Sequence, residues 1–372
     1  MNGEPDAAPA SADLRPPHRL PLLVLGFVAL FIGIGAGLTR LGWSMPAAVQ
    51  DVTGFHGRLM VCGFFGVVIA LERAVALARL WAYLGPLAAG LGTALALAGA
   101  GTLAPWFFVA ASLVLLAATV QIFRRQRALF TFTLVLGAAA WACGCALWAG
   151  GAGVYEMVPW WLAFLVLTIA GERLELSRLR PPSAVANGVF AALLLATAAG
   201  LAGAATRVGQ TLFAAALLGL ALWLIRQDIA RRTVRGQGLT RFIAICLLSG
   251  YAWLAVGASV ALAAGELVPG TAAADSALHA VLLGFVFSMV FGHAPIIFPA
   301  VLRVAVPYHP TFYLPLALLH LSLLVRLAGD ASERFAWTQA GGALNALALA
   351  AFILSTASAV LRGKRQSAPR AH

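Results

Sequence analysis

The stretch SALHAVLLGFVFSMVFGHAPIIFPAV, residues 276–301, is almost wholly apolar apart from His279 and His293. About 20 apolar residues in a helix suffice to cross the hydrocarbon core of a membrane, and this run is longer. It also lacks the strict alternation of a strand in a membrane β-barrel. The stretch therefore predicts a membrane-spanning helix that carries two imidazoles in an apolar environment.

The rest of the chain has the same character. Of its 372 residues, 62% are hydrophobic and 10% are charged, which predicts an integral membrane protein. Because unpaired backbone groups are costly in hydrocarbon, such runs form helices, so we expect an all-α polytopic fold. Twelve spans are expected, at residues 20–43, 54–77, 80–101, 103–123, 128–150, 156–176, 184–205, 208–226, 240–265, 273–303, 311–329 and 335–361.

Basic residues cluster in every second connection, which places the N- and C-termini in the cytoplasm and predicts a multi-pass protein of a bacterial inner membrane. Residues 1–19, rich in Pro and Ala, are expected to form a disordered cytoplasmic tail. Residues 20–362 are expected to form one transmembrane domain, and 363–372 a basic cytoplasmic tail. The net charge of +12 is spread over many short segments, which argues against nucleic acid as a partner.

An ionisable side chain deep in a membrane is costly and therefore marks a candidate functional site. His56 begins the second span and His279 lies early in the tenth, so both are expected at similar depth near the outer face. Two imidazoles from two helices at one depth could bind a haem iron from both sides. Alternatively, each histidine donates a hydrogen bond to a neighbouring carbonyl or lines a water-filled crevice.

A second group of polar residues is expected toward the inner side. His293 lies fourteen residues after His279, and Glu72, Glu172 and Glu175 lie near the inner ends of the second and sixth spans. These four side chains could form a carboxylate and imidazole site for iron, manganese or protons, with His320 of the eleventh span in contact with either site. Alternatively, the glutamates pair with adjacent arginines at headgroup level. Polar inner ends on spans two, six and ten indicate a pseudo-threefold repeat of four helices.

The four cysteines, Cys62, Cys143, Cys145 and Cys246, all fall within expected spans, where we interpret them as small apolar packing residues. A Cys-x-x-Cys-His motif is absent from the sequence, which argues against ordinary c-type haem attachment.

The arrangement resembles subunit I of the haem-copper oxidase superfamily in its twelve spans, its "HGRLM" (56–60) at the start of span two and its histidine early in span ten. It is more similar to the NnrS family of haem- and copper-containing membrane proteins, through "GYAWLAVG" (250–257) and "HAVLLGFVFSMVFGH" (279–293). The resemblance implies His56 and His279 as axial ligands of a haem, of b-type, and a role in electron transfer or in handling nitric oxide during respiratory stress. A redox partner protein or a quinone, together with membrane lipid, would then be its partners.

The chain departs from the oxidases in spans six and seven, which contain no histidine that could hold their copper. A second metal, non-haem iron or copper, would depend on His293 with Glu172 and Glu175, an arrangement that looks more like nitric oxide reductases. The rival interpretation is a proton-coupled transporter in which Glu72, Glu172, Glu175 and His293 relay protons. A third interpretation is an assembly factor without chemistry of its own; no catalytic residue is assigned.

Overall fold

The computed structural model describes residues 13–177 and 181–367, with side chains as far as residue 364. Within these residues all regular structure is helical, and twelve helical spans are long and apolar enough to cross a membrane, which confirms the all-α multi-pass architecture. The spans comprise α1 (Pro16–Arg40), α3, η2 and α4 (His56–Arg58, Leu59–Phe65, Gly66–Leu77), η3 and α5 (Leu80–Tyr83, Leu84–Leu97), α6 (Ala104–Arg125), α7 (Leu129–Ala149), α8 (Val154–Leu176), α9 (Ala184–Ala202), α10 (Arg207–Gln227), α12 (Gly238–Ala264), α13, η5 and α14 (Ala272–His279, Ala280–Phe287, Ser288–Leu302), η6 and α15 (Pro310–Phe312, Tyr313–Ala331) and α16 (Phe335–Ser367).

The N-terminal boundary differs from the expectation. Helix α1 begins at Pro16 rather than after residue 19, because a proline in the first turn loses no helical hydrogen bond. Arg19, expected in a disordered tail, is only 3% exposed; its guanidinium donates to Asp13 and to the carbonyl of Val301. Residues 1–12 and 368–372 of the two expected tails lie outside the described residues.

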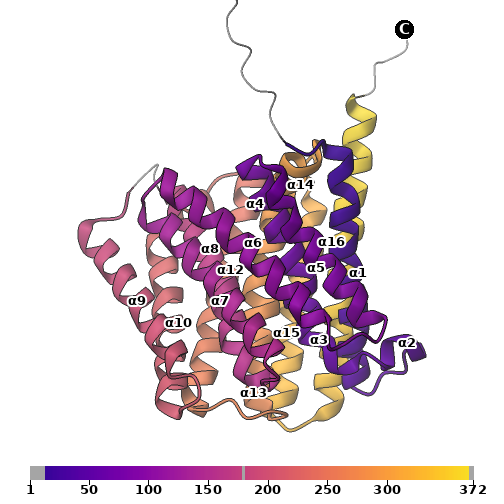
Figure 1. Cartoon of the computed structure of the whole chain (residues 1–372), viewed down its shortest axis with the longest axis vertical. Helices are drawn as coiled ribbons and strands as arrows, with labels where there is room; N and C mark the ends of the chain where they lie inside the picture. Colours follow the sequence, from indigo (N-terminus) through magenta and orange to yellow (C-terminus); the bar gives the residue numbers. More distant parts are fainter. Residues whose placement is uncertain (1–12, 178–180, 368–372) are drawn as a thin grey trace, which may run out of the picture.

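The two ends of the described chain lie at the same end of the bundle (Figure 1). Most consecutive spans pack against each other, whereas the second and tenth spans meet across a long sequence separation, through α4 and α14. The short helices α3 and α13, which carry His56 and His279, lie at the end of the bundle opposite the termini (Figure 1). The fold thus brings the start of span two and the start of span ten to one level.

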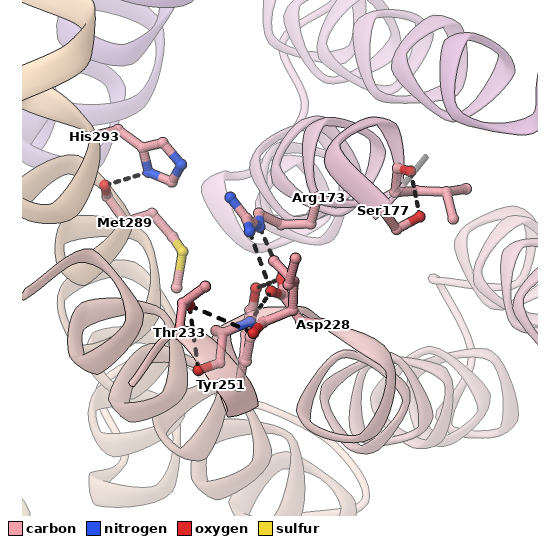
Figure 2. A network of polar contacts seen from close by, with 10 residues as sticks. Arg173, Ser177, Asp228, Thr233, Tyr251, Met289 and His293 are labelled. Atoms are coloured by element: carbon pink, nitrogen blue, oxygen red, sulfur yellow. Dashed lines mark hydrogen bonds and ion pairs between the residues drawn. The ribbon is translucent and has the colours of Figure 1, made fainter. Parts of the chain in front are cut away.

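A buried ion pair joins spans six, eight and nine near the other end. Asp228, in the connection after α10, accepts Arg173 Nε at 2.8 Å and Nη2 at 3.1 Å, with side-chain exposures of 1% and 6%. The hydroxyl of Tyr251 donates to the same carboxylate at 2.6 Å, and the backbone N–H of Ala230 donates at 2.7 Å (Figure 2). Every lone pair that faces the protein interior is used, which satisfies the condition for keeping charges buried.

We predict that Asp228→Asn destabilises the protein by about 3–5 kcal/mol, because it leaves the Arg173 charge buried without its counter-ion. Tyr251→Phe removes a single hydrogen bond to the carboxylate and should cost less, about 1.5–3 kcal/mol. Unfolding of the detergent-solubilised variants measures both effects. Equal stability of wild type and Asp228→Asn would show that this cluster does not hold the spans together.

Candidate functional site

His56 and His279 face each other at the end of the bundle opposite the termini. Their ring centroids are 6.4 Å apart and their planes differ by 19°. The expectation that spans two and ten present these two histidines at one depth agrees with this geometry. Both rings line the same cavity.

His56 is held by helix α1. Its Nδ1 hydrogen-bonds to the carbonyl oxygen of Gly33 at 2.7 Å. The ring lies over Gly37, one turn further along α1, where a Cβ would come within 2.7 Å of the His56 Cε1 atom. Gly37 is therefore required for the ring to reach its hydrogen-bond partner.

His279 is held by its own helix and by a charged pair. Its Nδ1 lies 2.8 Å from the carbonyl oxygen of Asp275 and 3.2 Å from the carboxylate of the same residue. That carboxylate accepts two hydrogen bonds from Arg326, at 2.7 and 2.8 Å. Ser276 also donates to Asp330 at 2.7 Å, so helix α13 is tied twice to helix α15. These contacts fix the orientation of the imidazole, as the outer partners of ligand histidines do in metal sites.

Both rings therefore use Nδ1 for anchoring, which leaves Nε2 of each ring for a further interaction. Within the described part of the chain, neither Nε2 has a hydrogen-bond partner. The alternative that each histidine donates to a nearby carbonyl is satisfied at Nδ1, but it does not account for the second nitrogen of either ring. Each imidazole thus has one nitrogen that is left for a ligand.

Each histidine is followed by a π-helical segment. Segment η2 begins three residues after His56, and η5 begins immediately after His279. The two segments pack through Phe64 and Phe287, each eight residues after its histidine, with ring centroids 5.9 Å apart and planes at 4°. Wide π turns inside α-helices are frequent at functional sites, because they rotate the side chains that precede them.

A cavity of about 470 Å³ contacts both imidazoles, and we call it the histidine cavity. Its walls are mainly apolar and aromatic, and its charged lining residues are Arg40, Arg326, Asp275, Asp330 and Glu333. Its size and lining are those of small-molecule sites. The histidine cavity therefore has the size and walls for a mainly apolar ligand beside both imidazoles.

The inner residues are arranged differently from the expected metal site. Arg73 donates to Glu172 at 3.4 Å, and Glu72 lies close enough to Glu172 to act on it electrostatically. His293 hydrogen-bonds to the Met289 carbonyl at 2.7 Å and lies beside the Arg173–Asp228 pair (Figure 2). Among residues 13–177 and 181–367, no three His, Cys, Asp or Glu side chains lie close enough together to bind a metal ion. Glu72, Glu172, Glu175 and His293 do not form such a group in the described residues, and a second metal site there stays a prediction.

His320 belongs to neither group of residues. Its Nδ1 accepts a hydrogen bond from Trp253 Nε1 at 2.9 Å, and its Nε2 is buried without a partner among the described residues. Of the cysteines, three are buried as expected, whereas Cys143 is exposed. The sulfurs of Cys62 and Cys145 lie 3.9 Å apart, a proximity that the sequence did not indicate.

Asp275 and Arg326 are the site residues that sequence reasoning missed. Arg326 lies four residues before Asp330 and is followed by Glu333 and Arg334, a mixture of charges that is typical of a connection between spans. The signal for Asp275 in the sequence was its position four residues before His279, a spacing that puts both side chains on one helix face. Asp228 was missed for a related reason, because it lies among the basic residues 226–235 and reads there as a solvated charge.

We predict that Asp275 and Arg326 are energetically coupled. Asp275→Asn and Arg326→Leu should each lower the free energy of unfolding, and the double variant should lose less than the sum by about 1–3 kcal/mol. Arg125→Leu, at an exposed arginine of α6, is the control and should be additive with Asp275→Asn. Additivity of the Asp275 and Arg326 substitutions would contradict the pairing.

Comparison with known families covers nearly the whole chain. The model of a domain of unknown function, DUF8744, matches residues 19–361. Among curated proteins, none matches the sequence. The match extends through all twelve spans and includes both histidines of the cavity, so the chain belongs to the DUF8744 family.

Proposed function

We propose that the protein is a membrane haem protein that binds one haem between His56 and His279 and transfers electrons. The observation that carries the proposal is the pair of anchored imidazoles 6.4 Å apart across a cavity. Two bonds from a metal to imidazole nitrogens of about 2.0 Å each, with about 1.1 Å from each nitrogen to its ring centre, place the ring centres about 6.2 Å apart. The observed separation fits one metal ion between the rings.

The pair of imidazoles also fits a metal ion that is already held by a porphyrin ring. Two imidazoles leave a bare metal ion short of ligands, since structural metal sites need at least four. A porphyrin supplies its own equatorial nitrogens and needs only two axial donors. His56 and His279 would hold the haem iron, and Arg40, which lines the same cavity, would supply positive charge for the porphyrin carboxylates.

A bound haem supplies an iron couple that takes up and releases one electron at a time. The chain's own residues favour electron transfer over the binding of nitric oxide. Both imidazoles are fixed through Nδ1, His279 with the further help of the Asp275–Arg326 pair, so neither is free to leave the metal. Most of the side chains that line the cavity around them are apolar.

We further propose that the protein lies in a bacterial inner membrane with both termini in the cytoplasm and the histidine cavity toward the periplasm. The alternation of basic connections along the sequence and the common end of both termini in Figure 1 support this orientation. The similarity of "HAVLLGFVFSMVFGH" to the NnrS family supports a role in respiration or in nitric oxide stress. The recurrence of polar inner ends on spans two, six and ten supports a four-helix repeat.

We predict that the purified protein, expressed with ample haem, shows a reduced α band near the b-type position. His56→Ala and His279→Ala should each abolish the band, because one axial donor is lost. His293→Ala is the matched control: His293 lies in the same span as His279 and makes the same kind of bond through Nδ1, but it lies beside Arg173 and Asp228 rather than at the cavity. Absorption spectra of the four folded proteins decide the outcome.

A colourless, well-folded wild-type protein would reject the haem and favour the proton-coupled transporter. Loss of the band in His293→Ala as well would show that the two sites are not independent.

We predict that Gly37→Ala weakens haem binding by about 10- to 100-fold, the usual effect of disturbing a residue that orients a metal ligand. The added Cβ would push the His56 ring away from the Gly33 carbonyl. Gly188→Ala, where a Cβ meets open space, is the control and should bind haem like wild type. Titration of the apo proteins with haem measures both, and equal affinities would contradict the role of Gly37.

A further inference from the structure

A second cavity of about 540 Å³ lies beside the histidine cavity. It is enclosed by parts of helices α8, α10, α12 and α13 and by the connections at their ends opposite the chain termini. Four residues line both cavities: Tyr155, Val158, Leu162 and Leu278. Because Leu278 directly precedes His279, only one layer of side chains separates the second cavity from the proposed haem ligand.

The two cavities differ in charge. The charged residues that line the histidine cavity are of both signs, Arg40 and Arg326 with Asp275, Asp330 and Glu333, whereas those that line the second cavity, Glu156 and Glu266, are both acidic. Within the described chain, no Lys, Arg or His lines the second cavity. Its remaining surface is mostly aliphatic and aromatic, with Trp160 and Phe213 among the larger side chains.

This lining selects among membrane-soluble ligands. Carboxylates at the cavity wall repel the carboxylate of a fatty acid and the phosphate of a phospholipid. A neutral aromatic diol with an apolar tail avoids this repulsion, because its hydroxyls can donate hydrogen bonds to Glu156 and Glu266 while its ring and tail cover the apolar walls. The cavity volume lies within the usual range for ligands of that size.

We propose that the second cavity binds an isoprenoid quinol, and that the electrons of this quinol pass to the haem proposed in the histidine cavity. This inference rests on the proposed haem. The quinol would give up its two electrons one at a time, because a haem takes up one: the first would go to the ferric haem proposed beside the same cavity, leaving a semiquinone, and the second, after the semiquinone has left, to the haem of another protein molecule. The two protons would pass to the carboxylates of Glu156 and Glu266, which line the same cavity.

The first test measures binding without haem. Apo protein is titrated with a benzoquinone that carries a ten-carbon tail, and quenching of tryptophan fluorescence is recorded. We expect saturable quenching, with a smaller amplitude in Trp160→Phe, because Trp160 lines the cavity. Ala261→Phe, which fills the cavity, should weaken binding at least tenfold; Ala263→Phe, at an exposed position of the same helix, should bind like wild type.

The second test measures electron transfer. The corresponding quinol is mixed with ferric, haem-loaded protein, and the reduced α band is followed. We expect one quinol to reduce two protein molecules, and we expect Glu156→Gln to slow the reduction several-fold while quinone binding persists. The glutamine can still accept the hydrogen bond from the Gly153 N–H that caps helix α8, so the fold is kept.

The outcomes separate the two proposals. Quinone binding that is unchanged in Ala261→Phe, or competed equally by a neutral long-chain alcohol, would overturn the quinol site and leave the haem intact. Binding without reduction of the haem would overturn the electron path. If the protein binds quinone but shows no haem band, the proposed haem and the proposed electron transfer are both overturned. The binding of quinone in the second cavity would then be the part of the proposal that stands.

Discussion

The hydrogen bonds from Nδ1 of His56 and His279 to backbone carbonyls determine what this end of the protein can do. In a hydrocarbon environment a polar atom without a partner is costly, so a side chain placed there is either satisfied or kept for a ligand. Each of these imidazoles is satisfied at one nitrogen only, and the free nitrogens meet the same cavity. The rest of the site serves to keep the two rings apart and oriented: Gly37 admits one ring, and Arg326 fixes the acid beside the other.

The polar side chains at the two ends of the bundle differ in how completely they are hydrogen-bonded. Toward the termini, Asp228 is saturated by Arg173, Tyr251 and a backbone N–H, which leaves that cluster no capacity for a ligand. Toward the other end, each imidazole keeps one nitrogen free beside a cavity. A saturated cluster stabilises a fold, whereas an unsaturated one can bind a ligand. This contrast is why we propose chemistry for the histidine pair and a structural role for the Arg173–Asp228 ion pair.

The sequence predicted the architecture well because hydropathy and length act locally: each apolar run had to become a helix, and the twelve expected spans agree with the structure within a few residues. The pairing of His56 with His279 was also within reach, since equal depth follows from the direction of each span. Contacts between side chains on different helices could not be predicted from the sequence in this way. The partners of Arg73 and Arg173 were expected next to them in sequence, but they are Glu172 and Asp228 on other segments. Helix packing decides such pairs, and no local pattern in a single sequence encodes it.

Under the proposed function, the two neighbouring cavities would give an electron separate routes into and out of the site. An electron carrier needs one route in and one route out, and the wall of Tyr155, Val158, Leu162 and Leu278 is thin enough to serve as one of them. Under the proposed function the two cavities would hold different ligands: the cavity with the imidazoles would hold the haem, and the cavity lined by Glu156 and Glu266 would hold a neutral donor of protons. A single layer of side chains would separate the two ligands and keep them close.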